Sequence, residues 1–218
     1  MVPQIRILIA DDHQMMRAGL RALLEQRPGV KVVAEADDGR TAVQLAQQLS
    51  PDVVVMDINM PDLNGVEATR QICAEGKGPK VIALTGYAPS TFAVEMLNAG
   101  ASAYLLKTGA VAELSKALDA VCAGKIYLSP EVSDEVMNKT PREANGRRSV
   151  FSKLSARERE VLQLLTEGKA TKEVAARLNV SIKTVESHRR NLMEKLDLHS
   201  VAELTKYAIR EGITSPEF

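Results

Sequence analysis

The chain has 218 residues, of which 45% are apolar and 3% aromatic, so it can bury a core in one large domain or two small ones. No stretch approaches the ~18 apolar residues of a membrane span, and the first apolar run is too short for a signal peptide. The formal net charge is zero, but residues 1–130 carry net −2 and residues 151–218 net +2. This asymmetry suits a cation site followed by a module that binds a polyanion. Cys73 and Cys122 lack ligand-like spacing, so we expect reduced thiols in a cytoplasmic protein.

Five short apolar runs, each followed by a longer helical pattern, fill the first 125 residues. The runs expected to form buried strands are Ile5–Ala10, Val30–Ala36, Val53–Met56, Val81–Leu84 and Ala103–Leu106. The helical patterns are His13–Gln26, Arg40–Leu49, Val66–Ala74, Thr91–Asn98 and Val111–Ala123. Continuous apolar strands that alternate with helices predict a doubly wound α/β fold, with a five-stranded parallel sheet covered on both faces.

The pattern changes beyond this region. A polar, turn-rich segment at Thr140–Ser149 is typical of a linker, and a short helix over Glu131–Met137 is expected before it. Four helical patterns follow, two of which begin with a Ser-x-x-Glu capping box. They are Arg157–Thr166, Lys172–Leu178, Ile182–Leu196 and a last helix from Val201 to Arg210. We therefore predict a second, small, all-α domain.

Polar side chains directly follow four of the predicted strands. They are Asp11 and Asp12 after the first strand, Asp57 after the third, Thr85 after the fourth and Lys107 after the fifth. Because ligands of open parallel sheets bind outside the carboxyl ends of the strands, we expect all five to meet at one edge. Any one aspartate alone could be a helix cap, but five such residues at strand ends indicate a site.

Three clustered carboxylates repel one another unless a cation lies between them. Oxygen ligands without Cys or His suit Mg²⁺. A carboxylate can also attack a phosphoryl group and form an acyl phosphate, while a lysine and Mg²⁺ neutralise charge on the phosphoryl oxygens. The hydroxyl of Thr85 could then donate a hydrogen bond to one of those oxygens.

Four short motifs resemble the receiver domain of two-component response regulators. They are Ile9-Ala-Asp-Asp-His13, Val55-Met-Asp-Ile-Asn-Met-Pro61, Leu84-Thr-Gly86 and Tyr104-Leu-Leu-Lys107. The resemblance covers residues 3–127 and implies that Asp57 accepts phosphate from a sensor histidine kinase. It also implies a set of further roles: Mg²⁺ ligands at Asp11, Asp12, Asp57 and the Asn59 backbone carbonyl, a phosphate contact at Lys107, and a switch pair of Thr85 and Tyr104.

Haloacid-dehalogenase-type phosphatases offer an alternative, because they also use an aspartate nucleophile after a strand. They place a second aspartate two residues later as the general acid, and here that position is Asn59, which cannot do acid-base work. A receiver that works without phosphate is disfavoured by the complete carboxylate set. A receiver that serves only protein interactions is disfavoured by the second domain. We therefore expect a regulator and not an enzyme.

The predicted helix Ile182–Leu196 has an apolar arc that contains Val185 and Leu192. The opposite face carries polar residues: Lys183, Glu186, Ser187, Arg190 and Glu194. From periodicity alone, this face fits equally well a recognition helix in a DNA major groove or an ordinary solvated surface.

Two longer segments resemble the LuxR/FixJ/NarL-type helix-turn-helix domain. They are Leu154-Ser-Ala-Arg-Glu-Arg-Glu-Val-Leu162 and the run from Val180 to Leu196. The resemblance covers residues 152–213 and leaves 128–151 as the linker. It implies that Glu186, Ser187 and Arg190 face bases, that Lys183 and Thr184 face phosphates, and that the last helix dimerises. The expected protein is a cytoplasmic, phosphorylation-dependent transcription regulator that binds double-stranded DNA, forms a homodimer when phosphorylated and has no membrane partner.

Overall fold

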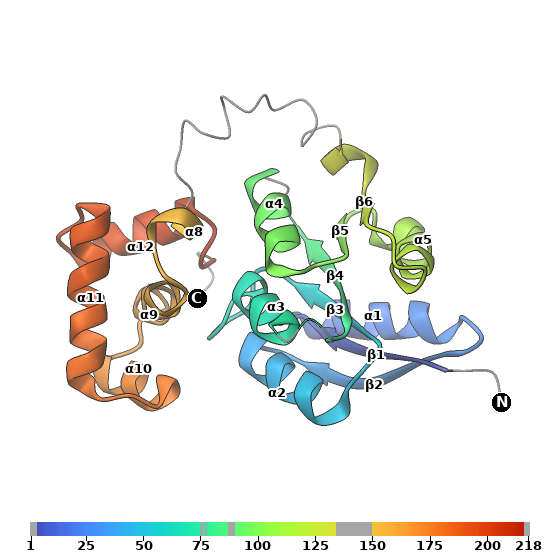
Figure 1. The fold of residues 1–218 in the computed structure, drawn as a ribbon, viewed down its shortest axis with the longest axis horizontal. Coiled ribbons are helices and arrows are strands. Elements are labelled where there is room, and N and C mark those ends of the chain that lie inside the picture. The colour runs from blue at the N-terminus through green and yellow to red at the C-terminus, as the bar shows by residue number, and fades with distance from the viewer. Residues whose placement is uncertain (1–3, 75, 77, 87–89, 134–149, 216–218) are drawn as a thin grey trace.

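The structure is a computed structural model that describes residues 4–74, 76, 78–86, 90–133 and 150–215. Figure 1 shows an α/β part built on one sheet, with an all-helical part beside it. The predicted combination of a doubly wound parallel domain and a small helical domain is confirmed.

The sheet contains six parallel strands in the order β2-β1-β3-β4-β5-β6. Their bounds are β1 Ile5–Ala10, β2 Val30–Ala36, β3 Val53–Asp57, β4 Lys80–Thr85, β5 Ala103–Leu106 and β6 Tyr127–Leu128. The five predicted strands are present, and β6 adds a two-residue edge strand too short to show a sequence period. Because the chain first runs outward to β2 and then returns to β3, the strand order reverses between β1 and β3. The ends of these two strands therefore lie side by side at the switch point.

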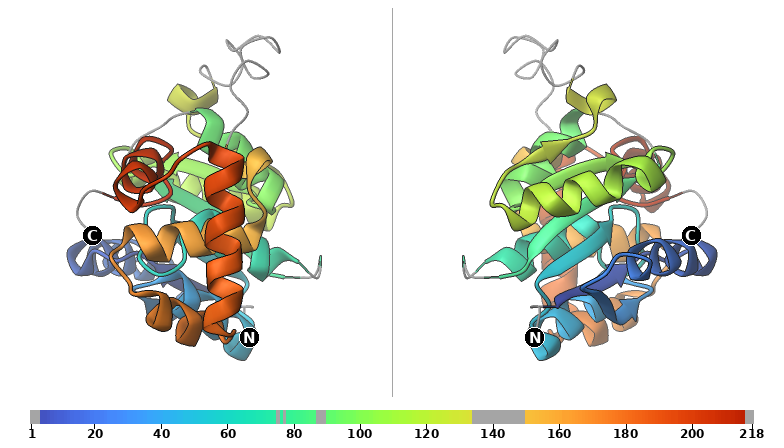
Figure 2. Two further views of the ribbon diagram at one scale, coloured as in Figure 1. Left: turned by 90° about the vertical axis from the view of Figure 1, so that its left-hand side faces the viewer. Right: turned by 90° about the vertical axis from the view of Figure 1, so that its right-hand side faces the viewer.

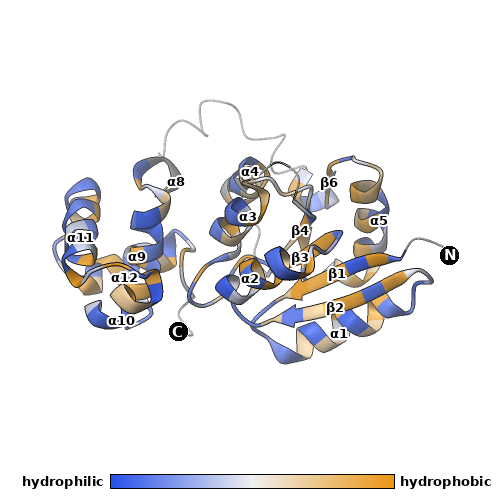
Figure 3. Ribbon diagram, turned by 60° about the horizontal axis from the view of Figure 1, so that its bottom comes forward, coloured by the Kyte–Doolittle hydropathy of each residue, from blue (hydrophilic) through white to orange (hydrophobic). Residues whose placement is uncertain are grey.

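Helices cover both faces of the sheet (Figure 1). On one face lie α1 (Gln14–Glu25) and α5 (Ala110–Cys122), and on the other lie α2 (Gly39–Leu49), α3 (Gly65–Cys73) and α4 (Ser90–Ala99). Successive residues of β3 enter opposite clusters, since Val54 and Met56 face α2 to α4 whereas Val53 and Val55 face α1 and α5. The strands are accordingly mostly orange in Figure 3, while the helices carry both colours.

The helical part contains α8 (Val150–Lys153), α9 (Ala156–Thr166), α10 (Thr171–Leu178), α11 (Ile182–Leu196) and α12 (Val201–Arg210) around an apolar core of its own. Both predicted capping boxes are formed, at Ser155 with Glu158 and at Ser200 with Glu203. Only the single turn α8 was not predicted. The order and lengths of the other four helices follow the sequence pattern.

The segment between the two parts is described only at its ends. Residues 130–133 are helical, which covers the start of the helix expected over Glu131–Met137, and Val132 is buried in the apolar cluster under α2 to α4. The rest of that helix and the polar segment Thr140–Ser149 lie outside the described residues.

The helical part docks on the α/β part through α9. The Gln163 side chain is fully buried and accepts a hydrogen bond from the Asn64 backbone N–H at 2.8 Å. Its Nε2 donates to the Met60 carbonyl at 2.9 Å. Beside it, Arg159 Nε lies 2.7 Å from Glu67 Oε1, and both side chains are at most 5% exposed. Polar residues of α9 are therefore buried between the two parts of the molecule.

Candidate functional sites

The ends of β1, β3 and β5 bring two carboxylates and one ammonium group together. Lys107 Nζ lies 2.8 Å from Asp11 Oδ2 and 2.7 Å from Asp57 Oδ2. Asp11 and Asp57 are 0% and 2% exposed. The predicted convergence at this sheet edge is thus present for these three residues, with one ammonium group shared by two buried carboxylates.

Asp12 and His13 complete the acidic cluster at the start of α1. His13 Nδ1 lies 2.7 Å from Asp12 Oδ1 and 3.4 Å from Asp11 Oδ1. Ligand atoms of Asp11, Asp12, His13 and Asp57 all lie within 4.8 Å of one another. Such a cluster, rich in carboxylate oxygen, fits a hard divalent cation. We did not predict a place for His13 here, although its position directly after the Asp-Asp pair was the available signal.

The environment of Asp57 disfavours its charged form. Burial raises the pKa of the Asp57 carboxyl to about 6, the nearby charge of Lys107 opposes this rise, and the charges of Asp11 and Asp12 add to it. Burial lowers the pKa of Lys107, but its two carboxylate partners outweigh that effect and leave it raised. Lys107 therefore stays protonated, and a bound cation would favour the ionised form of Asp57.

A pocket of about 500 Å³ opens over the carboxylates and is lined by Asp12, Asp57 and Lys107 together with Asn59. The Asn59 backbone N–H donates to Asp57 Oδ1 at 3.3 Å, and its side chain is exposed. The loop after β3 is held close, because a Cβ on Gly65 would lie 2.0 Å from the Asp57 carbonyl oxygen. Glycine at this position allows the loop to pass directly over the backbone of the site.

Thr85 and Tyr104 lie on neighbouring strands beyond this pocket. Thr85 ends β4 and is 3% exposed, while Tyr104 on β5 is fully buried. Thr85 and Asn59 also line a smaller cavity of about 130 Å³. The tyrosine ring is therefore already inside the protein in this structure.

The predicted reading helix α11 presents the expected two faces. Val185 and Leu192 are fully buried, whereas Lys183, Glu186 and Arg190 are exposed. Figures 1 and 2 place α11 on the side of the helical part that points away from the sheet. Its outer face is therefore uncovered in the docked arrangement.

The start of α11 is fixed by its cap. The Ser181 hydroxyl accepts a hydrogen bond from the Thr184 N–H at 3.1 Å, and the two hydroxyls lie 2.8 Å apart. Thr184 is partly buried, as is Ser187. The predicted phosphate contact at Thr184 thus has to share a hydroxyl that already pairs with the cap residue.

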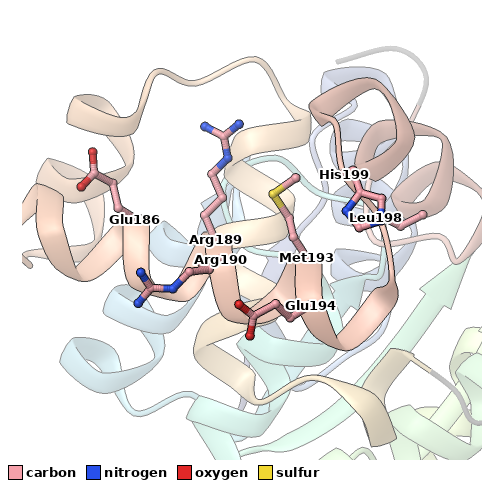
Figure 4. A pocket seen from close by; sticks show the side chains of 7 residues that line it. All are labelled: Glu186, Arg189, Arg190, Met193, Glu194, Leu198 and His199. Atoms are coloured by element: carbon pink, nitrogen blue, oxygen red, sulfur yellow. The ribbon is translucent and has the colours of Figure 1, made fainter.

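A shallow hollow of about 400 Å³ runs along the outer face of α11 (Figure 4). Glu186, Arg190 and Glu194 line it, together with Arg189, which was not among the predicted contacts. In Figure 4 the two arginine side chains point in different directions from the helix. The Arg-Arg pair in the sequence was the signal that could have identified the second one.

Both parts of the chain match known protein families. Residues 7–119 match the family described as "Response regulator receiver domain", and residues 152–208 match "Bacterial regulatory proteins, luxR family". The chain is also 40% identical over 211 residues to the transcriptional regulatory protein LiaR of Bacillus subtilis (strain 168). The matched region covers 97% of this chain and all of LiaR. This chain is a response regulator with a LuxR-type DNA-binding domain.

Two solved structures of the RcsB response regulator resemble this response regulator in fold. RcsB of Salmonella enterica serovar Typhimurium, bound to the promoter rprA with the phosphomimetic BeF3−, gives a TM-score of 0.63 at 30% identity. It covers 94% of this chain and 98% of RcsB. A structure of two RcsB dimers bound to two parallel DNAs gives a TM-score of 0.59 at 30% identity and covers 94% and 97% of the two chains. In the described part of this response regulator, no helix is long and apolar enough to cross a membrane.

Proposed function

We propose that this response regulator is phosphorylated on Asp57 by a histidine kinase and that the phosphorylated protein regulates transcription as a DNA-bound dimer in the cytoplasm. Residues 3–127 form the receiver, 128–151 the linker and 152–213 the DNA-binding domain. The main support is the Lys107 ammonium group, which lies within 2.8 Å of two buried carboxylates at the sheet's switch point. The RcsB dimers on DNA support the dimeric, DNA-bound form.

The chemistry needs Asp57 as a nucleophile. One of its oxygens attacks phosphorus as the bond to the donor imidazole nitrogen breaks, which gives an acyl phosphate and releases the imidazole. Lys107 stabilises negative charge on the phosphoryl oxygens, and the Thr85 hydroxyl donates a hydrogen bond to one of them. Mg²⁺ would be held by Asp11, Asp12, Asp57 and the Asn59 carbonyl, and when bound it would offset the charge that the phosphoryl group brings.

Phosphorylation then acts on Thr85 and Tyr104 as a switch pair. When the Thr85 hydroxyl moves toward the phosphoryl group, the space beside Tyr104 changes. The surface formed by α4, β5 and α5 changes with it and biases the pairing of receivers. In the DNA-binding domain, Glu186, Ser187 and Arg190 contact base edges, and Lys183 and Thr184 contact phosphates.

The test compares wild type with Asp57→Asn, each with and without acetyl phosphate and Mg²⁺. Affinity is measured on a DNA site selected from a random pool, and phosphorylation is followed by mass. Couplings of this kind are typically ~1–3 kcal/mol, so phosphorylation of wild type should change the affinity about 5–150-fold. Asp57→Asn should show no change. Equal affinity in all four samples, with wild type confirmed as phosphorylated, contradicts the switch.

A further inference from the structure

The chain after α12 returns to the phosphoacceptor pocket. Ile213 and Thr214 are 2% and 7% exposed, and the Ile213 N–H donates to the Ala208 carbonyl, which anchors the segment to the DNA-binding domain. The next residue, Ser215, lines the same pocket as Asp57 and Lys107. A segment fixed to one domain thus borders the reactive site of the other.

A second contact lies at the start of this segment. Gly212 has φ +67°, and a Cβ placed on it would lie 2.5 Å from the Phe92 ring of α4. Ile209 and Arg210 of α12 line the 130 Å³ cavity together with Thr85 and Asn59 of the receiver. The end of α12 therefore sits against the phosphoacceptor edge on the side of α4.

The third contact holds the two domains together next to the site. Gln163 bonds to Met60 and Asn64, which belong to the loop that begins directly after Asp57. The pair of Arg159 and Glu67 is buried beside that loop. Breaking these contacts leaves buried polar groups without partners unless the domains separate. Because α9 and the segment after α12 belong to the same domain, undocking of that domain from the loop would also withdraw the segment from the pocket.

We propose that the docked DNA-binding domain caps the phosphoacceptor pocket through residues 212–215, and thereby limits access of a protein phosphodonor while a small one still enters. The inference rests on the proposed function of Asp57. A phosphohistidine on a kinase has to bring a whole protein surface to the pocket mouth, whereas an acyl phosphate fits within about 500 Å³. Because α11 points away from the receiver, this docking controls entry of the donor and does not cover the DNA-reading face.

Access can be measured without any kinase by thiol labelling. In a full-length chain with Cys73→Ala and Cys122→Ser, Asp57→Cys places one thiol in the pocket. The reagents are N-ethylmaleimide and a maleimide that carries a 5 kDa polyethylene glycol, and the measured quantity is the ratio of the bulky rate to the small rate. Three changes are added singly to this parent. The first is termination after Thr214, which removes residues 215–218 and with them Ser215 of the pocket lining. The second is Glu67→Ala combined with Gln163→Ala, which breaks the docking contacts, and the third is Gln48→Ala, at an exposed glutamine of α2, as the control.

We expect the ratio to rise at least about tenfold when the docking contacts are broken, to rise less on truncation, and to stay at the parent value for Gln48→Ala. A ratio unchanged in both the truncated and the double variant overturns the cap.

Phosphorylation of the unlabelled wild type by acetyl phosphate is followed by mass as a separate arm. If the labelling ratio rises but Asp57 is never phosphorylated, the proposed function fails and the cap stands. If phosphorylation occurs with an unchanged ratio, the cap fails alone.

Discussion

The phosphoacceptor edge and the outer face of α11 are built in opposite ways. At the sheet edge, Asp11 and Asp57 are nearly inaccessible and share an ammonium group at 2.7 to 2.8 Å. On α11, Glu186 and Arg190 are exposed, and no hydrogen bond or ion pair joins their side chains to the described residues. The receiver thus has its charges in place before the ligand arrives, as phosphoryl transfer requires. If α11 reads DNA as proposed, these side chains find their partners only on DNA, so each residue should contribute individually and tolerate change better.

The largest effect is expected when the preorganised cluster loses a carboxylate. Asp12→Ala should abolish Mg²⁺-dependent phosphorylation by acetyl phosphate, because the remaining acidic ligands bind Mg²⁺ too weakly. Asp37→Ala, at an exposed loop position after β2, is the matched control and should behave as wild type. Mass spectrometry of the intact protein measures both. Normal phosphorylation of Asp12→Ala would remove Asp12 from the site.

Loss of the shared cation should be the next most severe change. Lys107→Ala leaves Asp57 without its ion-pair partner and removes a positive charge from the developing phosphoryl oxygens. Loss of one such electrostatic contact costs about 10²–10³-fold in rate. Initial rates of phosphorylation at saturating Mg²⁺ test this, with Lys116→Ala of α5 as a control outside the site. A rate within about twofold of wild type would show that Lys107 is only structural.

On the reading helix, single changes should have smaller and separable effects. Arg190→Ala should relax base preference at one position of each half-site, since a bidentate Arg–guanine contact contributes ~1–3 kcal/mol of discrimination. Lys183→Ala should weaken binding to all sequences alike and reduce the salt slope by about 1. Selection from a random DNA pool and titrations at several salt concentrations separate the two. A uniform loss in Arg190→Ala, without relaxed preference, contradicts its assignment to a base.

The smallest expected effect is a pH dependence of Mg²⁺ binding at the sheet edge. Without metal, Asp57 has a pKa of about 6, so at pH 7 it is mostly ionised and at pH 5 mostly protonated. Protons then compete with Mg²⁺ for Asp57, and the apparent affinity of the site for Mg²⁺ should fall about tenfold from pH 7 to pH 5. Calorimetric titration at the two pH values measures this. Affinity that does not change over this range would show that Asp57 is not a ligand.

The sequence predicted the α/β sheet and its reactive edge because each depends on local patterns. Continuous apolar runs marked the five long strands, and the residues after them marked the site. Docking could not be predicted, because Arg159 and Gln163 of α9 carry the polar character of a solvent-facing helix side. In the structure they are 5% and 0% exposed, since Glu67 and the loop after β3 supply their partners. From a single sequence, polar residues that are buried and paired across domains cannot be told apart from polar residues that face solvent.

The buried contacts of α9 also link the unfolding of the two halves. If the domains separated freely, each would melt at its own temperature. Because the contacts of Arg159 with Glu67 and of Gln163 with the loop after β3 form only when both domains are folded, unfolding of either half removes them from the other, which favours a single transition. Mg²⁺ bound by the folded receiver should therefore raise the melting temperature of a helical part whose described residues contain no acidic cluster of this kind. The melting temperature of the DNA-binding half would then depend in part on a metal that its own residues do not bind.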